Sequence, residues 1–471
     1  MSRENDTNRG ELPQVHPGSD NVLGIRRRDQ FIHSAIVGVL VGGVAVLFQV
    51  SLNFLETSRF SILESLKSYP AWGWCILPLA GGILAGVGGY LTQHYAPEAS
   101  GSGIPHIKAV LLNIRELHWR RLLPAKFFGG LLSIGGGLSL GREGPTVQMG
   151  AAVGKASAEY FHTTKHSTKH LIAAAAGAGL SAAFNAPLAG FIFVIEELQR
   201  ELSPLTFGSA FISCVTAVAI NRIFTGQLPS FHIRGYPMPS LTALPLFALV
   251  GLVSGYAGIG FNKLLIASVR KSKKLAMATW KKTAAMGVLA GLIAWWLPEA
   301  TGGGHHAAES ILQGRFASPN FILFLLIFFI VKFGFTIVSY ASGAPGGIFA
   351  PLLVLGAIIG LVFGQVSAFA FPELGTTPAA FAVVGMAAMF TSIVRAPLTG
   401  IVLILEMTGN QEQLFALILA CLISYLVAEH SGNKPIYESL LEEELSMSER
   451  KQALEELEGE TSPALFSGID Q

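Results

Sequence analysis

The sequence has few charged residues. Only 13% of its 471 residues are Asp, Glu, Lys or Arg, whereas 51% are hydrophobic; a typical soluble domain has about 25% charged residues. This deficit excludes an ordinary soluble globular protein and indicates a polytopic, all-α membrane protein. The formal net charge is +2, and no long basic stretch alternates with aromatic residues, so we expect no nucleic-acid partner.

Residues that could hold a metal ion are also scarce. The three cysteines are far apart in apolar segments, which favours buried thiols over a metal site: Cys75, Cys214 and Cys421. Three histidines at four-residue intervals could share a helix face, but the Thr, Ser and Lys residues around them favour a solvated loop: His162, His166 and His170. We therefore expect no metal and no cofactor.

Eleven apolar stretches recur between residues 31 and 426. Several are shorter than the roughly 20 residues of a spanning helix. Others are interrupted by Gly and Pro at 101–105, 141–145, 186–187, 343–351 and 396–397. Interrupted helices leave backbone groups exposed at membrane depth, which is tolerated only around a cavity or pathway. The pattern predicts a transport pathway.

Charge and apolar runs also predict the domain organisation. Three arginines end the polar segment 1–30, and the run that follows, 31–55, is too long for a signal-peptide core. This segment and the basic stretch 270–282 are expected to face the cytoplasm. We expect transmembrane halves at 31–226 and 242–436, joined by a linker at 227–241. Residues 437–471, with leucines at helical spacing at 441, 445, 454 and 457, are expected to form a short cytoplasmic helix and tail.

An internal repeat supports two related halves. Residues 186–196 match residues 396–406 in the pattern Ala-Pro-Leu-x-Gly and in a final glutamate. Upstream, glycines and prolines correspond in the same order: Gly141, Pro145, Gly150 and Gly154 with Gly347, Pro351, Gly356 and Gly360. Repeats that each contain a broken helix are typical of transporters with a binding site at the midplane.

The repeat also distinguishes glutamates that occur in both halves from glutamates that occur in only one. Glu196 is matched by Glu406, so we expect it to be structural. Glu143 instead stands opposite Phe349, and Glu197 stands opposite a methionine. An ionisable group at membrane depth is a functional candidate by default. Glu143 and Glu197, which break the symmetry, are therefore the better functional candidates.

Three Gly-rich segments begin predicted helices: GSGIP at 101–105, GREGP at 141–145 and GGIFAP at 346–351. Glycine permits a tight turn and proline suits the first helical turn, which leaves free N–H groups at a positive helix end. If such ends converge, they can bind a small anion without a fixed cation that would hold it too tightly.

These three segments resemble the signature motifs of the CLC family of chloride channels and chloride/proton antiporters, written there as GSGIP, GK/REGP and GxFxP. The similarity covers about residues 28–440 and keeps the family's motif order. It implies a homodimer in a prokaryotic plasma (inner) membrane, with both termini cytoplasmic. Each subunit would hold its own pore, built from two inverted-topology halves with tilted and broken helices.

The resemblance also implies roles for individual residues. Chloride would be bound by two hydroxyls and by main-chain amides: Ser102, Tyr437, Ile348 and Phe349 at a central site, and Arg142 to Gly144 at an outer one. Glu143 matches the gating glutamate, which occupies an anion position and leaves it on protonation. Glu197 matches the inner proton-transfer glutamate, a position where family channels generally have a non-acidic residue. Glu197 therefore favours chloride/proton exchange.

Alternatives remain at several positions. A passive chloride channel of the same fold would use Glu143 as a gate and leave Glu197 without a role. Ser102 with a nearby histidine, His94 or His106, could suggest an intramembrane serine protease, but the repeat and the three helix starts argue against an enzyme. His106 also departs from the family motif, where a glutamate is usual, and this affects the expected pH dependence. Among the cations in apolar surroundings, we favour a pathway role only for Lys126.

Overall fold

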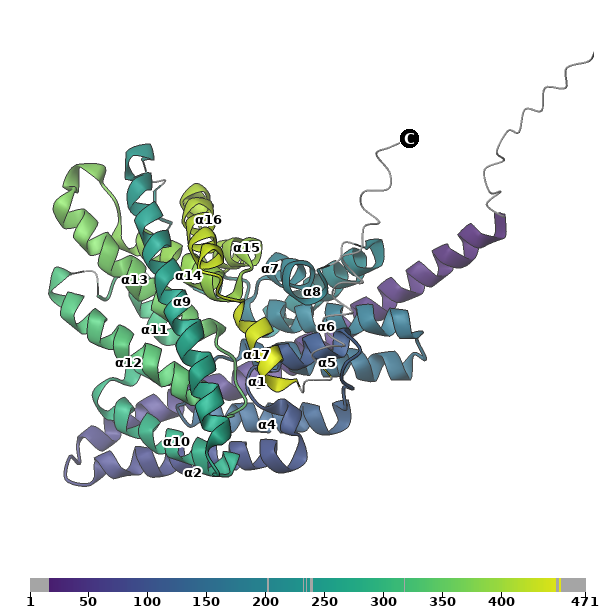
Figure 1. Ribbon diagram of the computed structural model, residues 1–471, viewed down its shortest axis with the longest axis horizontal. Coiled ribbons are helices and arrows are strands. Elements are labelled where there is room, and N and C mark those ends of the chain that lie inside the picture. The colour runs from purple at the N-terminus through teal and green to yellow at the C-terminus, as the bar shows by residue number, and fades with distance from the viewer. Residues whose placement is uncertain are drawn as a thin grey trace, which may run out of the picture.

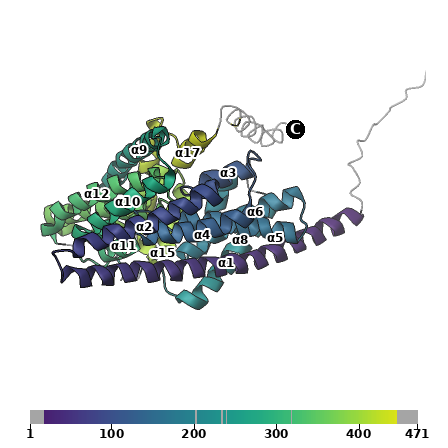
Figure 2. The ribbon, with the colours of Figure 1, turned by 90° about the horizontal axis from the view of Figure 1, so that it is seen from below.

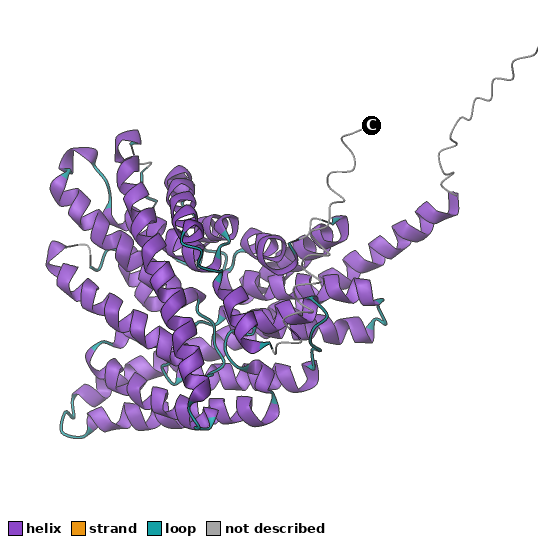
Figure 3. Ribbon diagram, in the orientation of Figure 1, coloured by secondary structure: helices purple, strands orange, loops and turns teal. Residues whose placement is uncertain are grey.

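The computed structural model describes residues 17–200, 203–231, 233, 235–237, 240–316, 318–445 and 449. Within these ranges the chain forms helices joined by loops and turns and contains no strand (Figure 3). Two isolated bridges, Gly101 with Pro345 and Gly141 with Gly347, join loop segments that are far apart in the chain. The expected all-α class is confirmed.

The helices follow one another in two matching series. The first series is α1 (Pro17–Lys67), α2 (Gly73–Tyr95), α3 (Ile104–Leu111), α4 (Trp119–Gly135), α5 (Glu143–Tyr160), α6 (Lys165–Phe184), α7 (Pro187–Phe193) and α8 (Pro204–Thr225). The second is α9 (Leu244–Lys274), α10 (Thr279–Trp296), α11 (His305–Leu312), α12 (Ile322–Ala341), α13 (Phe349–Ala370), α14 (Pro378–Val394), α15 (Pro397–Thr408) and α16 (Leu414–His430), after which comes α17 (Ile436–Glu444). A short 3₁₀ turn precedes both α3 (Pro97–Ala99) and α11 (Pro298–Ala300).

Seven of the described helical segments are long and apolar enough to cross a membrane: Arg28–Lys67, Gly73–Tyr95, Pro204–Thr225, Leu241–Lys274, Pro319–Ala341, Phe349–Ala370 and Gln411–His430. The protein is a multi-pass membrane protein. Helices α3, α7 and α11 have at most eight residues. These short helices cannot span a bilayer, which agrees with the predicted broken helices.

Two predicted apolar stretches are divided in the structure, the first of them at the interruption predicted for residues 186–187. Stretch 171–198 ends one helix at Phe184 and begins the next at Pro187, because Asn185 adopts a left-handed conformation with φ of 57°. Stretch 398–426 is divided by Gly409, whose φ is 65°. A single apolar run therefore contained two helices in each case. The short helix α11 was not expected from hydropathy, since it begins with two histidines.

The two halves lie side by side, with α9, α12 and α13 on one side and α5, α6 and α8 on the other, while α17 crosses between them (Figure 1). Corresponding helices of the two halves pack together, as α2 does with α10 and α7 with α15. Gly81 and Gly287 permit the first contact, because a Cβ atom on either one would lie within 2.5 Å of the other's carbonyl oxygen. Figure 2 shows α1 running along one side of the whole assembly.

The two ends of the chain are described only in part. Helix α1 begins at Pro17, so the first predicted span belongs to a longer helix, and residues 1–16 lie outside the described residues. At the other end, a short helix is present as α17, and its Leu441 and the adjacent Leu445 pack against Ala109 of α3. The leucines at 454 and 457 lie outside the described residues.

Candidate anion and proton site

Main-chain hydrogen bonds join the loops that precede α3, α5 and α13. Gly141 N donates to Gly347 O at 2.7 Å, and Gly347 N donates back to Gly141 O at 2.8 Å. Gly346 N donates to Gly101 O at 2.9 Å. The three Gly-rich segments, more than 200 residues apart at the extremes, therefore meet at one point, and their helices begin from it.

Glycine at position 144 makes this convergence possible. A Cβ atom there would lie 2.8 Å from the Ser102 carbonyl oxygen and 2.9 Å from the Gly347 Cα. Both distances are shorter than real carbon contacts allow, so any side chain would separate the loops. Helix N-termini brought this close combine their free N–H groups and their positive dipole ends, which is an arrangement suited to an anion.

Glu143 is fully buried at this junction. Its Oε1 accepts a short hydrogen bond from Ala350 N in the first turn of α13, whereas its Oε2 has no hydrogen-bond partner among the described residues. A Cβ atom on Gly141 would lie 2.1 Å from Oε1, so the absence of a side chain leaves room for the carboxylate. The carboxylate thus occupies an anion position at a helix start, and its hydrogen bond goes to α13 rather than to Arg142.

The two hydroxyl residues expected at the central site are also fully buried. Ser102 Oγ accepts from Ile104 N at 3.3 Å, which leaves its hydroxyl proton available as a donor. The Tyr437 hydroxyl has no partner among the described residues. Because buried polar groups are nearly always hydrogen-bonded, an unpaired buried hydroxyl is consistent with a site that receives a ligand.

Phe349 forms an aromatic wall beside these groups. Its ring centre lies 5.9 Å from that of Tyr437 and 4.7 Å from that of Phe390. Ile348 and Phe349 are the N-cap and first residue of α13, positions whose N–H groups have no partner within the helix. The main-chain donors and the apolar wall together would bind a small anion weakly enough to release it.

Glu197 lies in a π-helical turn, Val194–Gln199, that continues α7. Its side chain is 2% exposed, and its Oε1 accepts a hydrogen bond from Lys108 Nζ of α3 at 2.7 Å. Single π-turns within helices are frequent at functional sites. Lys108 is a functional candidate that the sequence signals only weakly, as a single lysine in the short helix that follows the first Gly-rich segment.

Comparison with known proteins places this arrangement in a family. The family model described as "Voltage gated chloride channel" matches residues 81–429. The chain belongs to this family, the CLC family.

Individual relatives are similar over nearly the whole chain. The "H(+)/Cl(-) exchange transporter ClcA" of Vibrio vulnificus is 40% identical over 418 residues, which cover 87% of this chain and 88% of the relative. The protein of the same name from Yersinia pestis is 38% identical over 429 residues, which cover 90% and 89%. The crystal structure of a "slow cyanobacterial Cl-/H+ antiporter" superimposes with a TM-score of 0.84 at 34% identity, over 93% of this chain and 99% of that one.

In this CLC chain, the glutamates shared by the two halves cap each other's helices. Glu196 accepts from Leu398 N at 3.1 Å and Thr399 N at 2.7 Å, at the start of α15. Glu406 accepts in the same way from Leu188 N at 3.1 Å and Ala189 N at 2.8 Å, at the start of α7. The expectation that Glu196 is structural is confirmed by this reciprocal capping.

Two buried lysines hold equivalent loops. Lys126 Nζ donates to Ala99 O at 2.8 Å and Gly101 O at 2.7 Å, just before α3. Lys332 Nζ donates to Ala300 O and Gly302 O, each at 3.1 Å, before α11. Lys126 therefore contributes to the site by fixing the loop that carries Ser102. The ammonium group is bonded to that loop's carbonyl oxygens, and the pathway role favoured by the sequence stays a prediction.

The histidine triplet is arranged differently from the prediction. The composition predicts a solvated loop, but residues 165–170 form the first turns of α6, whose N-cap Thr164 accepts from Ser167 N at 3.3 Å. His166 and His170 lie on this helix with their Nε2 atoms 3.1 Å apart, while His162 lies in the preceding turn. No group of three or more His, Cys, Asp or Glu suited to a metal was found in the described ranges.

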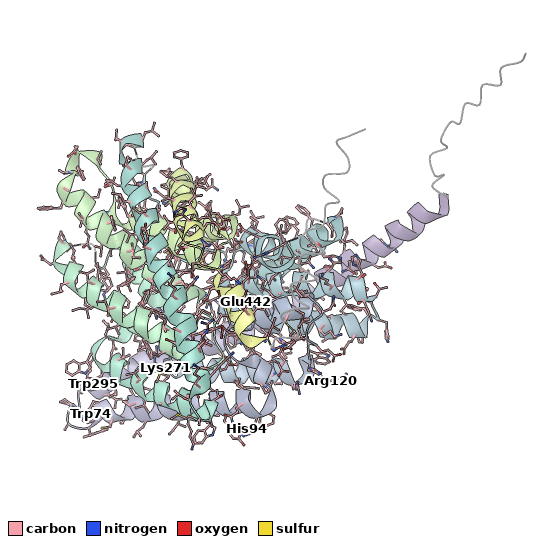
Figure 4. The ribbon with its side chains drawn as sticks, viewed as in Figure 1. Trp74, His94, Arg120, Lys271, Trp295 and Glu442 are labelled. Atoms are coloured by element: carbon pink, nitrogen blue, oxygen red, sulfur yellow. The ribbon has the colours of Figure 1, made fainter. Side chains whose placement is uncertain are left out.

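The residues that suggested a protease do not form a catalytic pair. His94 lies at the end of α2 at the edge of the molecule, where its ring stacks on Tyr90 (Figure 4). His106 faces Gln148 of α5, with 3.3 Å between His106 Nδ1 and Gln148 Nε2. Neither histidine is the hydrogen-bond partner of Ser102, whose Oγ bonds to Ile104 N.

Proposed function

We propose that the protein is a secondary active transporter that exchanges chloride for protons across the membrane. The observation that carries the proposal is the buried Glu143 carboxylate hydrogen-bonded to Ala350 N at the start of α13. A carboxylate and a chloride ion compete for the same N–H groups, so chloride binding favours release of the carboxylate, and a released carboxylate is free to take up a proton. Two ligands that shift one equilibrium in this way are thermodynamically coupled.

The proposed chloride path follows the converging helix starts. Ser102 and Tyr437 would bind the central chloride through their buried hydroxyls, together with the main-chain N–H groups of Ile348 and Phe349. The main chain from Arg142 to Gly144 would line the outer position, which opens when Glu143 leaves it. The activity proposed is transport, with no chemical change to either ion and no cofactor.

Glu197 is the proposed inner proton acceptor. It is a buried carboxylate in a helix of the first half, and its second-half counterpart is the uncharged Met407. A carboxylate kept at such depth without a counterpart in the repeat fits a proton-transfer role. The proteins of 38–40% identity named above are described as exchange transporters, which favours exchange over a passive channel.

We also propose that the protein is a homodimer in the plasma (inner) membrane, with residues 31–226 and 242–436 as its two halves and 227–241 as the linker. The basic end of α9 and the C-terminal α17 lie on the same side: Arg270 Nε donates to Glu443 Oε1 at 2.8 Å. Figure 4 shows Lys271 on α9 and Glu442 on α17 at this side. By the excess of Lys and Arg in cytoplasmic loops, this side and both termini would be cytoplasmic.

The test is simultaneous recording of chloride and proton movement in liposomes that contain the purified protein. An outward chloride gradient should drive protons inward against their own gradient. A protein that conducts chloride while protons follow only their own gradient would be a passive channel, and the exchange proposal would then be wrong.

A further inference from the structure

The proposed exchange mechanism assigns no role to the salt bridge between Lys108 and Glu197. The Nζ to Oε1 distance is 2.7 Å, and the two side chains are 9% and 2% exposed. Exposed ion pairs contribute little to stability, whereas removal of one partner of a buried pair is strongly destabilising, because the other charge stays buried and unpaired. The ionisation of the Glu197 carboxylate therefore depends on the positive charge of Lys108.

Helix α3 connects this pair to the chloride site. The helix has eight residues and begins at Ile104, next to Ser102, and Lys108 lies on its second turn. Its C-terminal end packs on α17, which carries Tyr437. One short, buried helix thus positions a proposed chloride ligand at its start and the cation that contacts the proposed proton acceptor one turn later.

Other charged or titratable groups also lie near Glu197. Tyr437 of α17 is uncharged, and its hydroxyl has no hydrogen-bond partner among the described residues. Glu196, the preceding residue, accepts hydrogen bonds at the start of α15.

Arg200, at the end of the same π-helical segment, forms an ion pair with Glu438 of α17. His170 of α6 is hydrogen-bonded to α8 through Nδ1. Helix α7 contributes no charged residue. Lys108 is therefore the cation in direct contact with the carboxylate in this part of the described chain.

We propose that Lys108 is a positioning residue for the proton arm of exchange. Its ammonium group orients Glu197 and favours the ionised carboxylate, so that taking up a proton from the cytoplasmic side requires the pair to separate. This inference rests on the proposed function. In the exchange cycle, Lys108 then sets the pH range over which the Glu197 carboxylate takes up a proton, while Glu197 itself transfers that proton.

The test is the pH dependence of chloride-driven proton transport in liposomes, measured with internal pH varied. Lys108→Met removes the cation, so Glu197 should take up a proton at higher pH. An opposite charge at this distance shifts carboxylate protonation by about one to three pH units, and the pH of half-maximal proton transport should rise by that amount. Lys108→Arg retains the charge and should restore the wild-type profile.

Three further variants make the outcome specific. Lys108→Gln keeps a hydrogen-bond donor without charge and takes the place of Lys108→Met if that variant does not fold; the same upward shift is expected. Lys155→Met is the matched control, since Lys155 pairs with Glu159 at 3.6 Å in a partly exposed position, and it should leave the profile unchanged. In a Glu197→Gln background, Lys108→Met should change proton transport no further.

The wild-type measurement separates the two proposals. If the wild type moves no protons against their gradient, the exchange function is wrong. If the wild type does so and Lys108→Met or Lys108→Gln keeps the wild-type pH profile, the role of Lys108 is wrong. A uniform fall of chloride and proton transport at every pH would also overturn it, because a merely structural lysine predicts that result.

Discussion

Substitution of Glu143 tests the centre of the proposed mechanism. Glu143→Gln keeps the size of the side chain, and its amide oxygen can still accept from Ala350 N, but the group can no longer carry a proton in exchange. Glu143→Ala removes the side chain and leaves the start of α13 unoccupied. Both variants should therefore abolish proton coupling while chloride still passes.

The structure allows the effect on chloride binding to be estimated. The carboxylate of Glu143 competes with chloride through one hydrogen bond that involves a charged group, a kind of bond that contributes about 1.5–3 kcal/mol. Because about 1.4 kcal/mol corresponds to a factor of ten, Glu143→Ala should strengthen chloride binding at this helix start by about one to two powers of ten. Glu143→Gln should strengthen chloride binding less, since the neutral amide still bonds to Ala350 N.

Isothermal titration with chloride measures the affinities, and the reversal potential under a pH gradient measures coupling. For a variant that conducts only chloride, the reversal potential should shift by about 59 mV per tenfold chloride gradient and should not respond to pH. For an exchanger that moves one proton per chloride, the reversal potential would shift by about 30 mV per pH unit, half of that single-ion value. A Glu143→Ala protein whose reversal potential still follows pH would refute the reasoning, and so would unchanged chloride affinity.

Three other substitutions test separate parts of the site. Glu197→Leu should stop proton transport and spare chloride transport in the same liposome recording; survival of both fluxes would assign the inner role to another residue. Gly141→Ala places a Cβ atom 2.1 Å from Glu143 Oε1, so it should displace the carboxylate and reduce the proton-to-chloride transport ratio. An unchanged ratio would contradict the position of the Glu143 carboxylate beside Gly141. Glu196→Ala leaves the Thr399 N–H without its partner and should lower stability by about 1–3 kcal/mol, seen as a lower thermal unfolding midpoint with the coupling ratio preserved.

Local sequence signals predicted much of the architecture. The break before Pro187 and its counterpart before Pro397 both occur as expected, because proline cannot continue a helix from the preceding turn and suits the first turn of the next. The repeated glutamates Glu196 and Glu406 also followed the symmetry of the repeat. These features depend on residues close in sequence or on a regular internal pattern.

Features that depend on distant contacts were not predictable in this way. Lys108 is a lone lysine whose meaning depends on Glu197, 89 residues later in the chain. The role of Lys126 follows from two carbonyl oxygens of a loop 25 to 27 residues earlier. No local pattern indicates which partner such a side chain will meet.

The sequence alone determined that this chain lies in a membrane, that its helices are broken at Gly- and Pro-rich segments, and that two related halves carry unequal glutamates. These properties follow from composition, backbone preference and repetition. Only the tertiary structure decided which groups meet. The Glu143 carboxylate bonds to Ala350 N, 207 residues away, because main-chain bonds between three loops bring two helix starts within reach, and such distances are a property of packing.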